Sequence, residues 1–338
     1  MEHMLAVSSR FDPTADLDAQ IATLDRLVEL CDRSLPLLGE VPATLAARVL
    51  HAFDAFVHAF DAVARGLCPE AAAALGARVQ ALVLPLLRRA GNGFRWYAKP
   101  RGYAGDFLTI AQMYDDVALG DDAVGALLDR CFLRLPAAQA VQNRRALLAT
   151  EIAATLRTCA GRTARVTSLA AGPARELFDV YATLPDPAVL AATVIDLDPE
   201  ALAYCAAHAT RMGLATPPRP IAANLIKVAF GRTVLDLADQ DLVYSIGLVD
   251  YFSDEIVVKL LDAVHAALRP GGRVILGNFH PANPTKAVMD HVLEWKLIHR
   301  SESDMHALYR ASAFGSGCSR IFYEAQGINL FAEGLKAR

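Results

Sequence analysis

Apolar residues recur every three or four positions through the first 160 residues of the chain. Two series show this spacing clearly: Leu17, Ile21, Leu24 and Val28, followed by Val49, Phe53, Phe56, Phe60, Val63 and Leu67. Positions spaced in this way share one face of an α-helix, and runs of β-branched residues are nearly absent here. We therefore predict an all-helical N-terminal domain over residues 1–135. Further helices are expected at 71–90, 107–118, 122–134 and 137–160.

The pattern changes after residue 160, where short strand-like runs alternate with helical stretches. Five such runs are Arg165–Ala170, Val189–Asp196, Pro220–Ala223, Asp241–Ile246 and Arg273–Phe279. Alternation of this kind is typical of βαβ units around a parallel sheet. After a helical insert that contains Trp295, residues 319–325 and 328–335 are separated by Gln326-Gly327, which predicts a terminal antiparallel hairpin. The sequence thus predicts an α/β domain over residues 136–338.

Composition narrows the class of protein. Hydrophobic residues make up 54% of the 338 residues and charged residues 21%, with a mean hydropathy of +0.28. A chain this apolar and this weakly charged is expected to be globular rather than disordered. The net charge is −4, from 33 basic and 37 acidic residues, and the basic residues are scattered. We therefore expect no nucleic-acid partner, because such a partner needs a concentrated basic surface.

Neither a membrane span nor a secretory signal is expected. The most apolar long window, 71–87, contains Arg78 and a late Pro85, so it falls short of the roughly 18 uncharged residues of a transmembrane helix. At the N-terminus, Glu2 precedes any apolar run. The six cysteines lie far apart with no C-x-x-C pair, which indicates reduced thiols. These features together predict a cytoplasmic protein.

The turn after the first predicted strand gives the first indication of a ligand. It reads Ser-Leu-Ala-Ala-Gly-Pro-Ala over residues 168–174, with a strand before it and a helix after it. A dinucleotide fingerprint needs G-x-G-x-x-G so that the backbone can approach a pyrophosphate. Only Gly172 is present here, and the methyl groups of Ala170 and Ala174 would crowd a pyrophosphate. The turn therefore favours S-adenosylmethionine, which has no pyrophosphate, over NAD.

An acidic residue follows at the end of the second predicted strand. Asp196 lies 24 residues after Gly172 (196 minus 172), in the run Ile-Asp-Leu-Asp-Pro-Glu over 195–200. A carboxylate in this position can accept hydrogen bonds from both ribose hydroxyls. The spacing fits NAD as well, so Asp196 predicts a nucleoside ligand without choosing between the two.

Residues 160–280 resemble a class I S-adenosylmethionine-dependent methyltransferase. Besides the two segments above, the similarity rests on Asp-Leu-Val-Tyr-Ser-Ile-Gly-Leu-Val-Asp-Tyr at 241–251 and Leu-Arg-Pro-Gly-Gly-Arg-Val-Ile-Leu at 268–276. The resemblance implies a Rossmann-like seven-stranded sheet and S-adenosyl-L-methionine as cofactor. It also implies these contacts: Ala170 and Gly172 at the methionine moiety, Asp196 with Leu197 at the ribose, Asn224 and Leu225 beside the adenine, and Ser245 and Gly247 in the floor. Alanines stand at 170 and 174 where the family usually has glycine, and Ser168 stands where it often has an acid.

A narrower similarity extends over most of the chain. The segment Lys-Pro-Arg-Gly-Tyr-Ala-Gly-Asp at 99–106, preceded by a helical domain, resembles the bacterial methyltransferases of 3-hydroxypalmitic acid methyl ester biosynthesis. Those relatives methylate the carboxyl group of a fatty acid to make a quorum-sensing signal. The resemblance implies a hydrophobic acid as substrate. It also implies that this segment forms a lid, with Tyr103 and Asp106 near the cofactor.

Methyl transfer from a sulfonium requires an aligned nucleophile in a dry site. A carboxylic acid is already ionised at neutral pH, because its pKa is near ~4, so it needs hydrogen-bond donors and a cation rather than a base. Arg101, Tyr103 and His280 are the candidates for that role. A hydroxyl substrate would need a base, and His280, which follows the fifth strand, is the expected one.

Four further residues are candidates for substrate binding. Asp250 and Tyr251 follow the fourth strand, and we expect them to face the methyl group; capping of a helix is the alternative for Asp250. Trp295 and Tyr309 in the insert are expected to wall an apolar pocket, with core packing as the alternative. No metal is expected at the histidines and carboxylates of 51–61, because they share the solvated face of an amphipathic helix.

The sequence therefore predicts a cytoplasmic carboxyl O-methyltransferase that acts on a hydrophobic small acid, such as a 3-hydroxy fatty acid. Three alternatives stay open: a hydroxyl O-methyltransferase that uses His280 as base, a cofactor-binding scaffold without catalysis, and an NAD-dependent enzyme. The expected partner is the small acid itself, and a homodimer is a further open expectation.

Overall fold

A computed structural model describes residues 13–338, which divide into two compact units. The helical unit contains residues 13–97, 118–135 and 284–295, and the sheet unit contains residues 98–117, 136–283 and 296–338. The expected contiguous domains, 1–135 and 136–338, differ from this division in two segments, 98–117 and 284–295. Residues 1–12, which carry the expectation about a secretory signal, lie outside the described residues.

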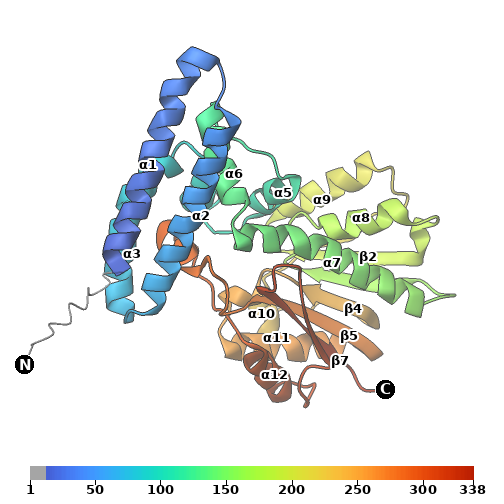
Figure 1. Ribbon diagram of the computed structural model, residues 1–338. Coiled ribbons are helices and arrows are strands. Elements are labelled where there is room, and N and C mark those ends of the chain that lie inside the picture. The colour runs from blue at the N-terminus through green and yellow to red at the C-terminus, as the bar shows by residue number, and fades with distance from the viewer. Residues whose placement is uncertain (1–12) are drawn as a thin grey trace, which may run out of the picture. The chain divides into compact units, whose positions relative to one another are not determined.

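The helical unit is built on the two apolar series of the sequence. Its helices are α1 (Pro13–Leu38), α2 (Ala43–Arg65), α3 (Pro69–Leu87), α4 (Gly91–Ala98) and α6 (Ala123–Leu133), with the π-helix η3 (Val288–Val292) (Figure 1). Every residue of the two series is buried except Leu67, which follows the end of α2. The predicted helical periodicity is confirmed here, and η3 packs against α2 and α3 to complete this core.

Helix α3 is the one described helix whose length and composition would allow it to cross a membrane. This differs from the expectation that the window 71–87 is too polar. Val79, Val83 and Leu87 of this helix are buried in the helical unit, and 33% of its apolar window is buried. Core helices of globular proteins can have the same length and apolar composition, so these properties of α3 are weak evidence for a membrane span.

The sheet unit is organised around seven strands in the order β3-β2-β1-β4-β5-β7-β6. Their bounds are β1 (Ala164–Leu169), β2 (Leu190–Asp196), β3 (Arg219–Ala222), β4 (Gln240–Ser245), β5 (Leu268–Phe279), β6 (Arg320–Tyr323) and β7 (Asn329–Leu335). Strands β1 to β5 pair in parallel, whereas β7 pairs antiparallel with both β5 and β6. The predicted parallel sheet and terminal antiparallel hairpin are both confirmed.

Helices cover both faces of this sheet (Figure 1). One face carries α7 (Pro136–Thr158), α8 (Arg175–Thr183) and α9 (Pro199–Arg211), and the other carries α10 (Leu225–Ala229), α11 (Asp254–Ala267) and α12 (Glu302–Ala311). Because strand side chains alternate, Leu242 and Tyr244 of β4 pack under the first set of helices and Val243 under the second. Burial on both faces explains why the central strands are almost continuously apolar.

The strand order reverses between β1 and β4, at the centre of the sheet. In open α/β sheets the crevice beyond the carboxyl ends of the strands at such a reversal is where ligands bind. The remaining elements of the sheet unit are the helix α5 (Phe107–Asp115) and two short 3-10 helices, η1 (Pro187–Val189) and η2 (Val249–Tyr251). Helix η2 begins at Val249, shortly after β4 ends at Ser245, so it lies at this edge of the sheet.

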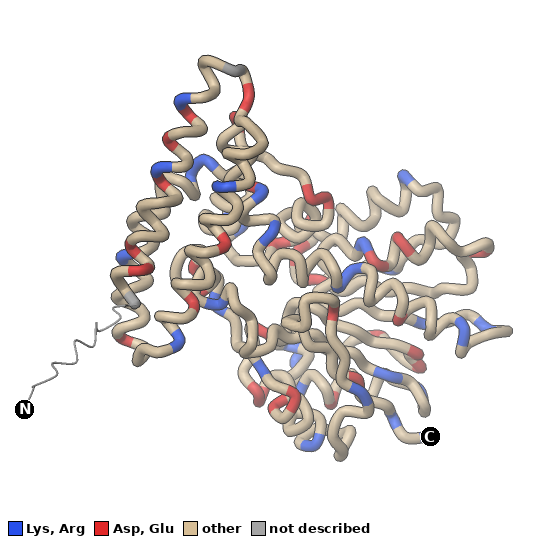
Figure 2. The backbone as a smooth tube through the Cα atoms, viewed as in Figure 1, with Lys and Arg blue, Asp and Glu red and all other residues tan. Residues whose placement is uncertain are grey.

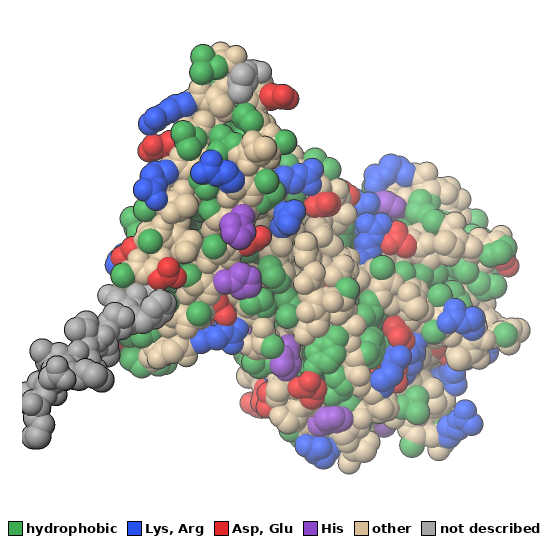
Figure 3. Space-filling model, in the orientation of Figure 1, with side chains coloured by type: hydrophobic (Ala, Val, Ile, Leu, Met, Phe, Trp, Pro, Cys, Tyr) green, Lys and Arg blue, Asp and Glu red, His purple; other side chains and the backbone are tan. Residues whose placement is uncertain are grey.

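Charged residues of both signs are interspersed along the described chain. Figure 2 shows acidic and basic positions alternating in both units, without a long run of either sign. On the face seen in Figure 3, charged side chains lie among hydrophobic and other side chains rather than in one block. That distribution agrees with the small net charge of −4.

Candidate cofactor and active site

A cavity of about 550 Å³ opens at the carboxyl edge of the sheet, beside β1, β2 and β4. Its volume lies within the range of roughly 300–1,000 Å³ typical of small-molecule sites. Its lining residues are Arg101, Tyr103, Ala104, Gly105, Phe107, Ala170, Gly172, Asp196, Leu197, Asp198, Ala223, Asn224, Leu225, Ile226, Gly247, Leu248, Tyr251 and Phe252. All of them belong to the sheet unit, and most of the predicted cofactor-binding residues are among them.

The turn after β1 forms one wall of the cavity. Ala170, Gly172 and Ala174 have positive φ angles of 50°, 52° and 47°. An alanine in this left-handed region costs roughly 1–2 kcal/mol, because its Cβ approaches the following carbonyl oxygen. This geometry gives a physical reason for the glycine usually found at positions 170 and 174 in the resembled family. At Gly172 an added Cβ would meet only Phe107, at 4.0 Å, so the ligand side of this residue is open.

Asp196 joins the ends of β1 and β2. Its Oδ2 accepts a hydrogen bond from the backbone N–H of Gly172 at 2.9 Å, and its Oδ1 accepts one from the N–H of Asp198 at 2.9 Å. Burial raises the pKa of the Asp196 carboxyl, and these two N–H donors oppose that rise. Each carboxylate oxygen has a further lone pair, so Asp196 can still accept hydrogen bonds from a ligand that lies in the cavity.

Asp198 fixes the segment 101–105 to the end of β2, a role that the sequence did not reveal. Arg101 donates to Asp198 at 2.7 Å and to Glu200 at 2.8 Å, and the hydroxyl of Tyr103 donates to Asp198 at 3.1 Å. Burial alone would raise the pKa of Asp198, but hydrogen bonds from Arg101, the Glu200 N–H and Tyr103 hold it below its usual value. Arg101 is therefore neutralised by its own chain. The signal in the sequence was the second aspartate of the Ile-Asp-Leu-Asp run.

Residues 101–107 form a strap along the cavity. Gly102 and Gly105 have φ angles of 85° and 73°, a conformation that glycine adopts without strain. Burial, together with the negative charge of Asp198, raises the pKa of Tyr103 to about 12, so its phenol stays protonated at neutral pH. Tyr251 donates to the carbonyl of Ala104 at 3.3 Å, which ties the strap to the segment after β4.

Asp106, a predicted cofactor contact, does not line the cavity. Its side chain is 1% exposed and accepts hydrogen bonds from the N–H groups of Leu108 and Thr109 at 3.0 and 3.3 Å. It therefore caps the N-terminus of α5. This cap holds the helix that presents Phe107 to the cavity.

The loop after β3 and the end of β4 supply the other walls. Asn224 caps α10 by accepting from the N–H groups of Ile226 and Lys227 at 2.9 and 3.2 Å, so its side chain is already engaged while Leu225 and Ile226 face the cavity. Ser245 is buried and donates to the carbonyl of Leu169 at 3.0 Å, which places it beneath the floor. Gly247, two residues later, lines the cavity itself.

Asp250 lies below the cavity surface rather than in its lining. Its side chain is 2% exposed and accepts a hydrogen bond from the N–H of Phe279 at 2.7 Å, so it links η2 to the end of β5. Burial raises the pKa of Asp250 to about 6, although Arg144 and Arg300 partly offset this effect. The structure thus gives Asp250 a bridging role that differs from both of the roles expected from the sequence, while Tyr251 is half-exposed at the cavity.

His280, Trp295 and Tyr309 are not among the cavity-lining residues. The Nδ1 of His280 accepts from the N–H of Ala282 at 3.1 Å, and its Nε2 lies 3.2 Å from Glu302. Tyr309 is fully buried and donates to the carbonyl of Ala332 at 2.8 Å, which matches the core-packing alternative. Trp295 is 7% exposed and belongs to the helical unit.

The described residues contain no group of three or more His, Cys, Asp or Glu side chains arranged to hold a metal ion. Among the histidines and carboxylates of 51–61, which were expected to be solvated, Asp61 is buried. It pairs with Arg65 at 2.5 Å and accepts from the N–H of Ala287 at 3.4 Å. The apolar face of α2 is therefore wider than the sequence indicated.

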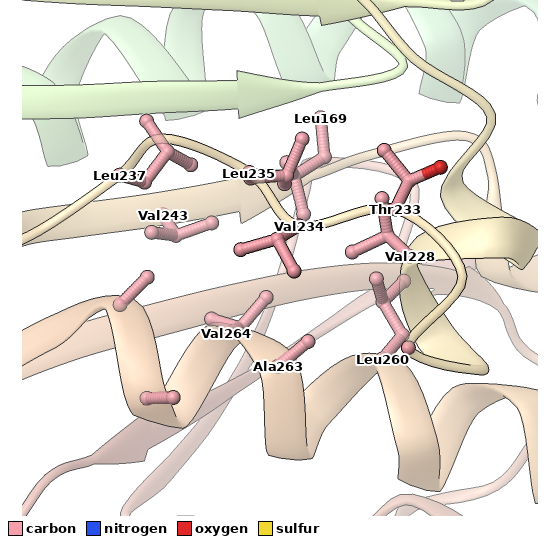
Figure 4. A pocket seen from close by; sticks show the side chains of 13 residues that line it. Leu169, Val228, Thr233, Val234, Leu235, Leu237, Val243, Leu260, Ala263 and Val264 are labelled. Atoms are coloured by element: carbon pink, nitrogen blue, oxygen red, sulfur yellow. The ribbon is translucent and has the colours of Figure 1, made fainter.

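A second cavity, of about 310 Å³, lies on the α10 and α11 side of the sheet (Figure 4). Figure 4 shows the side chains of Leu169 and Val243 from the strands, Val234 and Leu235 from the loop, and Val264 from α11 around it. None of its described lining residues is charged, so it offers no carboxylate to a ribose. The larger cavity is therefore the one that suits a nucleoside.

S-adenosyl-L-methionine fits the lining of the larger cavity by chemistry. Asp196 supplies an acceptor for sugar hydroxyls, Leu225 and Ile226 supply an apolar surface for a base, and Gly172 leaves room for close approach of a ligand to the backbone. The sheet order with its terminal antiparallel hairpin is that of a class I methyltransferase. Fold and cavity together agree with this class.

The comparisons with known proteins agree. A family model described as "putative methyltransferase" matches residues 49–328. This match covers more than half of the chain, so the protein belongs to that methyltransferase family. The expected class, an S-adenosyl-L-methionine-dependent methyltransferase with a Rossmann-like sheet, is thereby confirmed, and S-adenosyl-L-methionine is its cofactor. No curated protein matches the chain.

Among solved structures, a "possible exported protein" from Bordetella parapertussis is similar over 99% of this chain and 100% of its own, with 18% identity and a TM-score of 0.60. This similarity supports the fold. The methyltransferase SibL (20% identity, 96% of both chains, TM-score 0.48) and a Synechocystis magnesium protoporphyrin IX methyltransferase (10% identity, 59% of this chain and 83% of its own, TM-score 0.44) are more distant.

Proposed function

We propose that this protein transfers the methyl group of S-adenosyl-L-methionine to the carboxylate of a hydrophobic small acid, such as a 3-hydroxy fatty acid. The observation that carries this proposal is the chemistry of the larger cavity. Its described lining contains no His or Lys, and its ionisable side chains are the bonded Asp196, Asp198 and Arg101 and two tyrosines. A carboxylate acceptor suits such a lining, because it needs no base.

The cofactor, when bound, supplies an electrophilic methyl group on a sulfonium. The protein's part is then to position the acceptor and to exclude water. Asp196 is proposed to hold the ribose, and the strap 101–107 is proposed to cover the cavity from one side. Tyr103 can donate a hydrogen bond but cannot act as a base near neutral pH, because its pKa is about 12.

The hydrophobic character of the acceptor is supported by the walls of the cavity. Phe107, Leu248 and Phe252 present apolar side chains, and most of the surface of the cavity is apolar. The proposal that the acid is a fatty acid rests on the resemblance of the segment 99–106 to the methyltransferases of 3-hydroxypalmitic acid methyl ester biosynthesis. A methyl ester as product is therefore the more general part of the proposal, and the acyl chain is the more specific part.

Cofactor binding is tested by calorimetry with S-adenosylhomocysteine. We expect the Asp196→Ala variant to bind at least about tenfold more weakly than wild type, because a hydrogen bond to a charged group contributes roughly 1.5–3 kcal/mol. Asp236→Ala is the matched control, since this side chain is 93% exposed and pairs only with Arg219 among the described residues. Undiminished binding by Asp196→Ala would contradict the proposed ribose contact.

The reaction is tested by incubating the protein with labelled S-adenosyl-L-methionine and matched pairs of acids and alcohols. We expect label in base-labile methyl esters of medium- or long-chain acids and none in ethers. A product ether, with a basic limb in the pH profile that disappears in His280→Ala, would establish the hydroxyl alternative instead. Tight cofactor binding without turnover of any acceptor would favour a scaffold.

A further inference from the structure

Arg300 is a buried cation in the segment between η3 and α12, and the proposed function has not yet used it. The residue is 2% exposed. Its Nη1 donates to the backbone carbonyl of Val249 at 2.8 Å, and its Nη2 donates to that of Phe252 at 2.6 Å. Its other acceptors are Asn278 Oδ1, 2.9 Å from Nη1, and Asp254 Oδ1, 3.0 Å from Nε and 2.8 Å from Nη2. All three nitrogens are engaged within the chain, so Arg300 acts on other residues rather than on a ligand.

The two carbonyls that Arg300 binds flank the 3-10 helix η2. Val249 is the first residue of this helix, and Phe252 directly follows its last residue, Tyr251. Hydrogen-bond geometry in a 3-10 helix is poorer than in an α-helix, so a short one depends on its surroundings. Val249 and Phe252 are both buried, and loss of the guanidinium would leave their carbonyls with fewer donors, which is costly inside a protein. One planar side chain therefore fixes both ends of η2.

The backbone next to Arg300 ties the same helix to the end of β5. The N–H of Ile298 donates to the carbonyl of Asp250 at 2.8 Å, and the N–H of Arg300 donates to the carbonyl of Phe279 at 2.9 Å. The side chain of Asn278, on β5, is buried and donates to the carbonyl of Ile298 at 2.9 Å. Main chain and side chains of this segment thus join η2 to β5, with Arg300 at the junction.

Helix η2 in turn forms part of the wall of the larger cavity. Leu248, Tyr251 and Phe252 line that cavity. The hydroxyl of Tyr251 also donates to the carbonyl of Ala104 in the strap at 3.3 Å. A shift of η2 would therefore displace an apolar wall and loosen its contact with the strap, although Arg300 itself does not belong to the cavity lining.

We infer that Arg300 is a positioning residue for the acceptor, because it holds η2 where its apolar side chains can pack against the acid. This inference rests on the proposed function, in which Leu248 and Phe252 contact the hydrophobic acceptor. The proposed nucleoside contacts Asp196 and Leu225 belong to β2 and α10, whereas the described hydrogen-bond partners of Arg300 lie at η2, α11 and β5. A change at Arg300 should therefore affect the acid and spare the cofactor.

The test compares wild type with Arg300→Gln and Arg300→Lys. Calorimetry measures the Kd of S-adenosylhomocysteine, and steady-state kinetics with 3-hydroxypalmitic acid measures KM and kcat. We expect Arg300→Gln to raise the KM of the acid about tenfold or more, because an apolar wall is displaced, and to change the Kd of S-adenosylhomocysteine less than about twofold. A smaller fraction of folded protein would lower kcat but not raise KM, so KM separates positioning from loss of stability.

Arg300→Lys keeps the charge, but a single ammonium cannot donate to both carbonyls in the geometry of the planar fork. We therefore expect its KM to rise as well. Hydrogen exchange followed by mass spectrometry reports on η2 without any acceptor. Residues 247–253 should exchange faster in both variants than in wild type, because local opening of η2 becomes easier.

Arg273→Gln is the matched control, because Arg273 is another well-bonded arginine, on β5, whose partners lie outside the cavity lining. These partners are Glu151, Thr155 and Glu333. This variant should lose stability but keep the wild-type KM and the wild-type exchange of 247–253.

Three results would overturn the inference. They are wild-type KM and exchange in Arg300→Gln, an equal loss of affinity for the acid and for S-adenosylhomocysteine, and the same effects in Arg273→Gln. If wild type does not methylate the acid, the proposed substrate is wrong, and exchange alone decides: faster exchange of 247–253 confined to the Arg300 variants supports the inference, and unchanged exchange overturns it. If Arg300→Gln does not fold, Arg300→Lys decides by the same measurements.

Discussion

At the scale of single residues, the site depends on side chains whose roles follow from burial. Asp196 and Asp198 are two residues apart, yet one has a raised pKa and the other a lowered pKa. The difference arises because Asp198 has Arg101 as a partner, whereas Asp196 has only backbone donors. A sequence shows both as equal acids, and the distinction appears only when their partners are known.

Asp250 gives a prediction about pH at this scale. Its pKa is about 6 in the folded protein, against ~4 for an aspartate in an unfolded chain, so the folded state holds the proton more tightly. Its contribution to the free energy of unfolding is therefore fully present below about pH 4 and is lost as the pH rises through about 6. The loss should be roughly 3 kcal/mol, from about 1.4 kcal/mol for each of about two pKa units.

Asp250→Asn is neutral at every pH and keeps an oxygen that can accept from the N–H of Phe279. We expect this variant to show a flatter dependence of the free energy of unfolding on pH between 4 and 7 than wild type. Urea unfolding at a series of pH values measures it. The exposed Asp239→Asn serves as control and should follow the wild-type curve; identical curves for wild type and Asp250→Asn would refute the prediction.

At the scale of elements, the strap 101–107 and the N-terminus of α9 form one connected piece. Arg101 reaches both Asp198, which is 12% exposed, and Glu200, which is 67% exposed. The first ion pair is the better shielded from water, so it should hold the strap more strongly than the second. The resemblance of this segment implied a lid here, but the sequence did not show the partner that holds it.

Arg101→Ala should therefore release the strap. We expect turnover to fall more than cofactor affinity does, because the ribose contact of Asp196 remains while water gains access to the reacting groups. Steady-state kinetics compared with calorimetry of S-adenosylhomocysteine measures the two effects. Glu200→Gln removes only the exposed pair and should change both by less than about twofold. Equal effects of Arg101→Ala and Glu200→Gln would show that the buried pair has no special role.

At the scale of the whole molecule, the two units are not contiguous in the sequence. The segment 284–295 leaves the sheet unit after β5 and packs its Val288, Met289 and Val292 into the helical unit. The strap belongs to the sheet unit although it precedes α6 of the helical unit in the chain. Neither unit can therefore be cut out of the chain at a single point without loss of part of its core or site.

A fragment of residues 136–338 tests this organisation. It lacks the strap and α5, and it exposes the apolar residues of η3 that α2 and α3 cover in the full chain. We expect the fragment to be largely insoluble, or to bind S-adenosylhomocysteine at least about tenfold more weakly than the full chain. A fragment that is soluble, monomeric and binds with wild-type affinity would contradict this expectation. The full chain expressed in parallel is the reference.

Much of this organisation could be predicted from the sequence. Local periodicity predicts the helical series, the five parallel strands and the hairpin, and motifs of neighbouring residues predict the methyltransferase class. Both kinds of pattern can be recognised in the sequence alone. The same holds for Gly172, Asp196, Leu225 and Gly247, which line the cavity because each lies at the end of a strand or in the segment that directly follows one, at one edge of the sheet.

Which side chains reach the cavity depends on the tertiary structure. Asp198 stands in a run that the sequence singled out, but its partner Arg101 lies 97 positions away in the chain. Phe107 reaches the cavity because α5, which Asp106 caps, begins beside it. Asp106, Ser245 and Asp250 have sequence positions that suggest contact with a ligand, yet their side chains turn to backbone partners instead. Which way a side chain points depends on residues far away in the chain. For that reason local pattern determines the elements and the class of this protein, while packing determines its site.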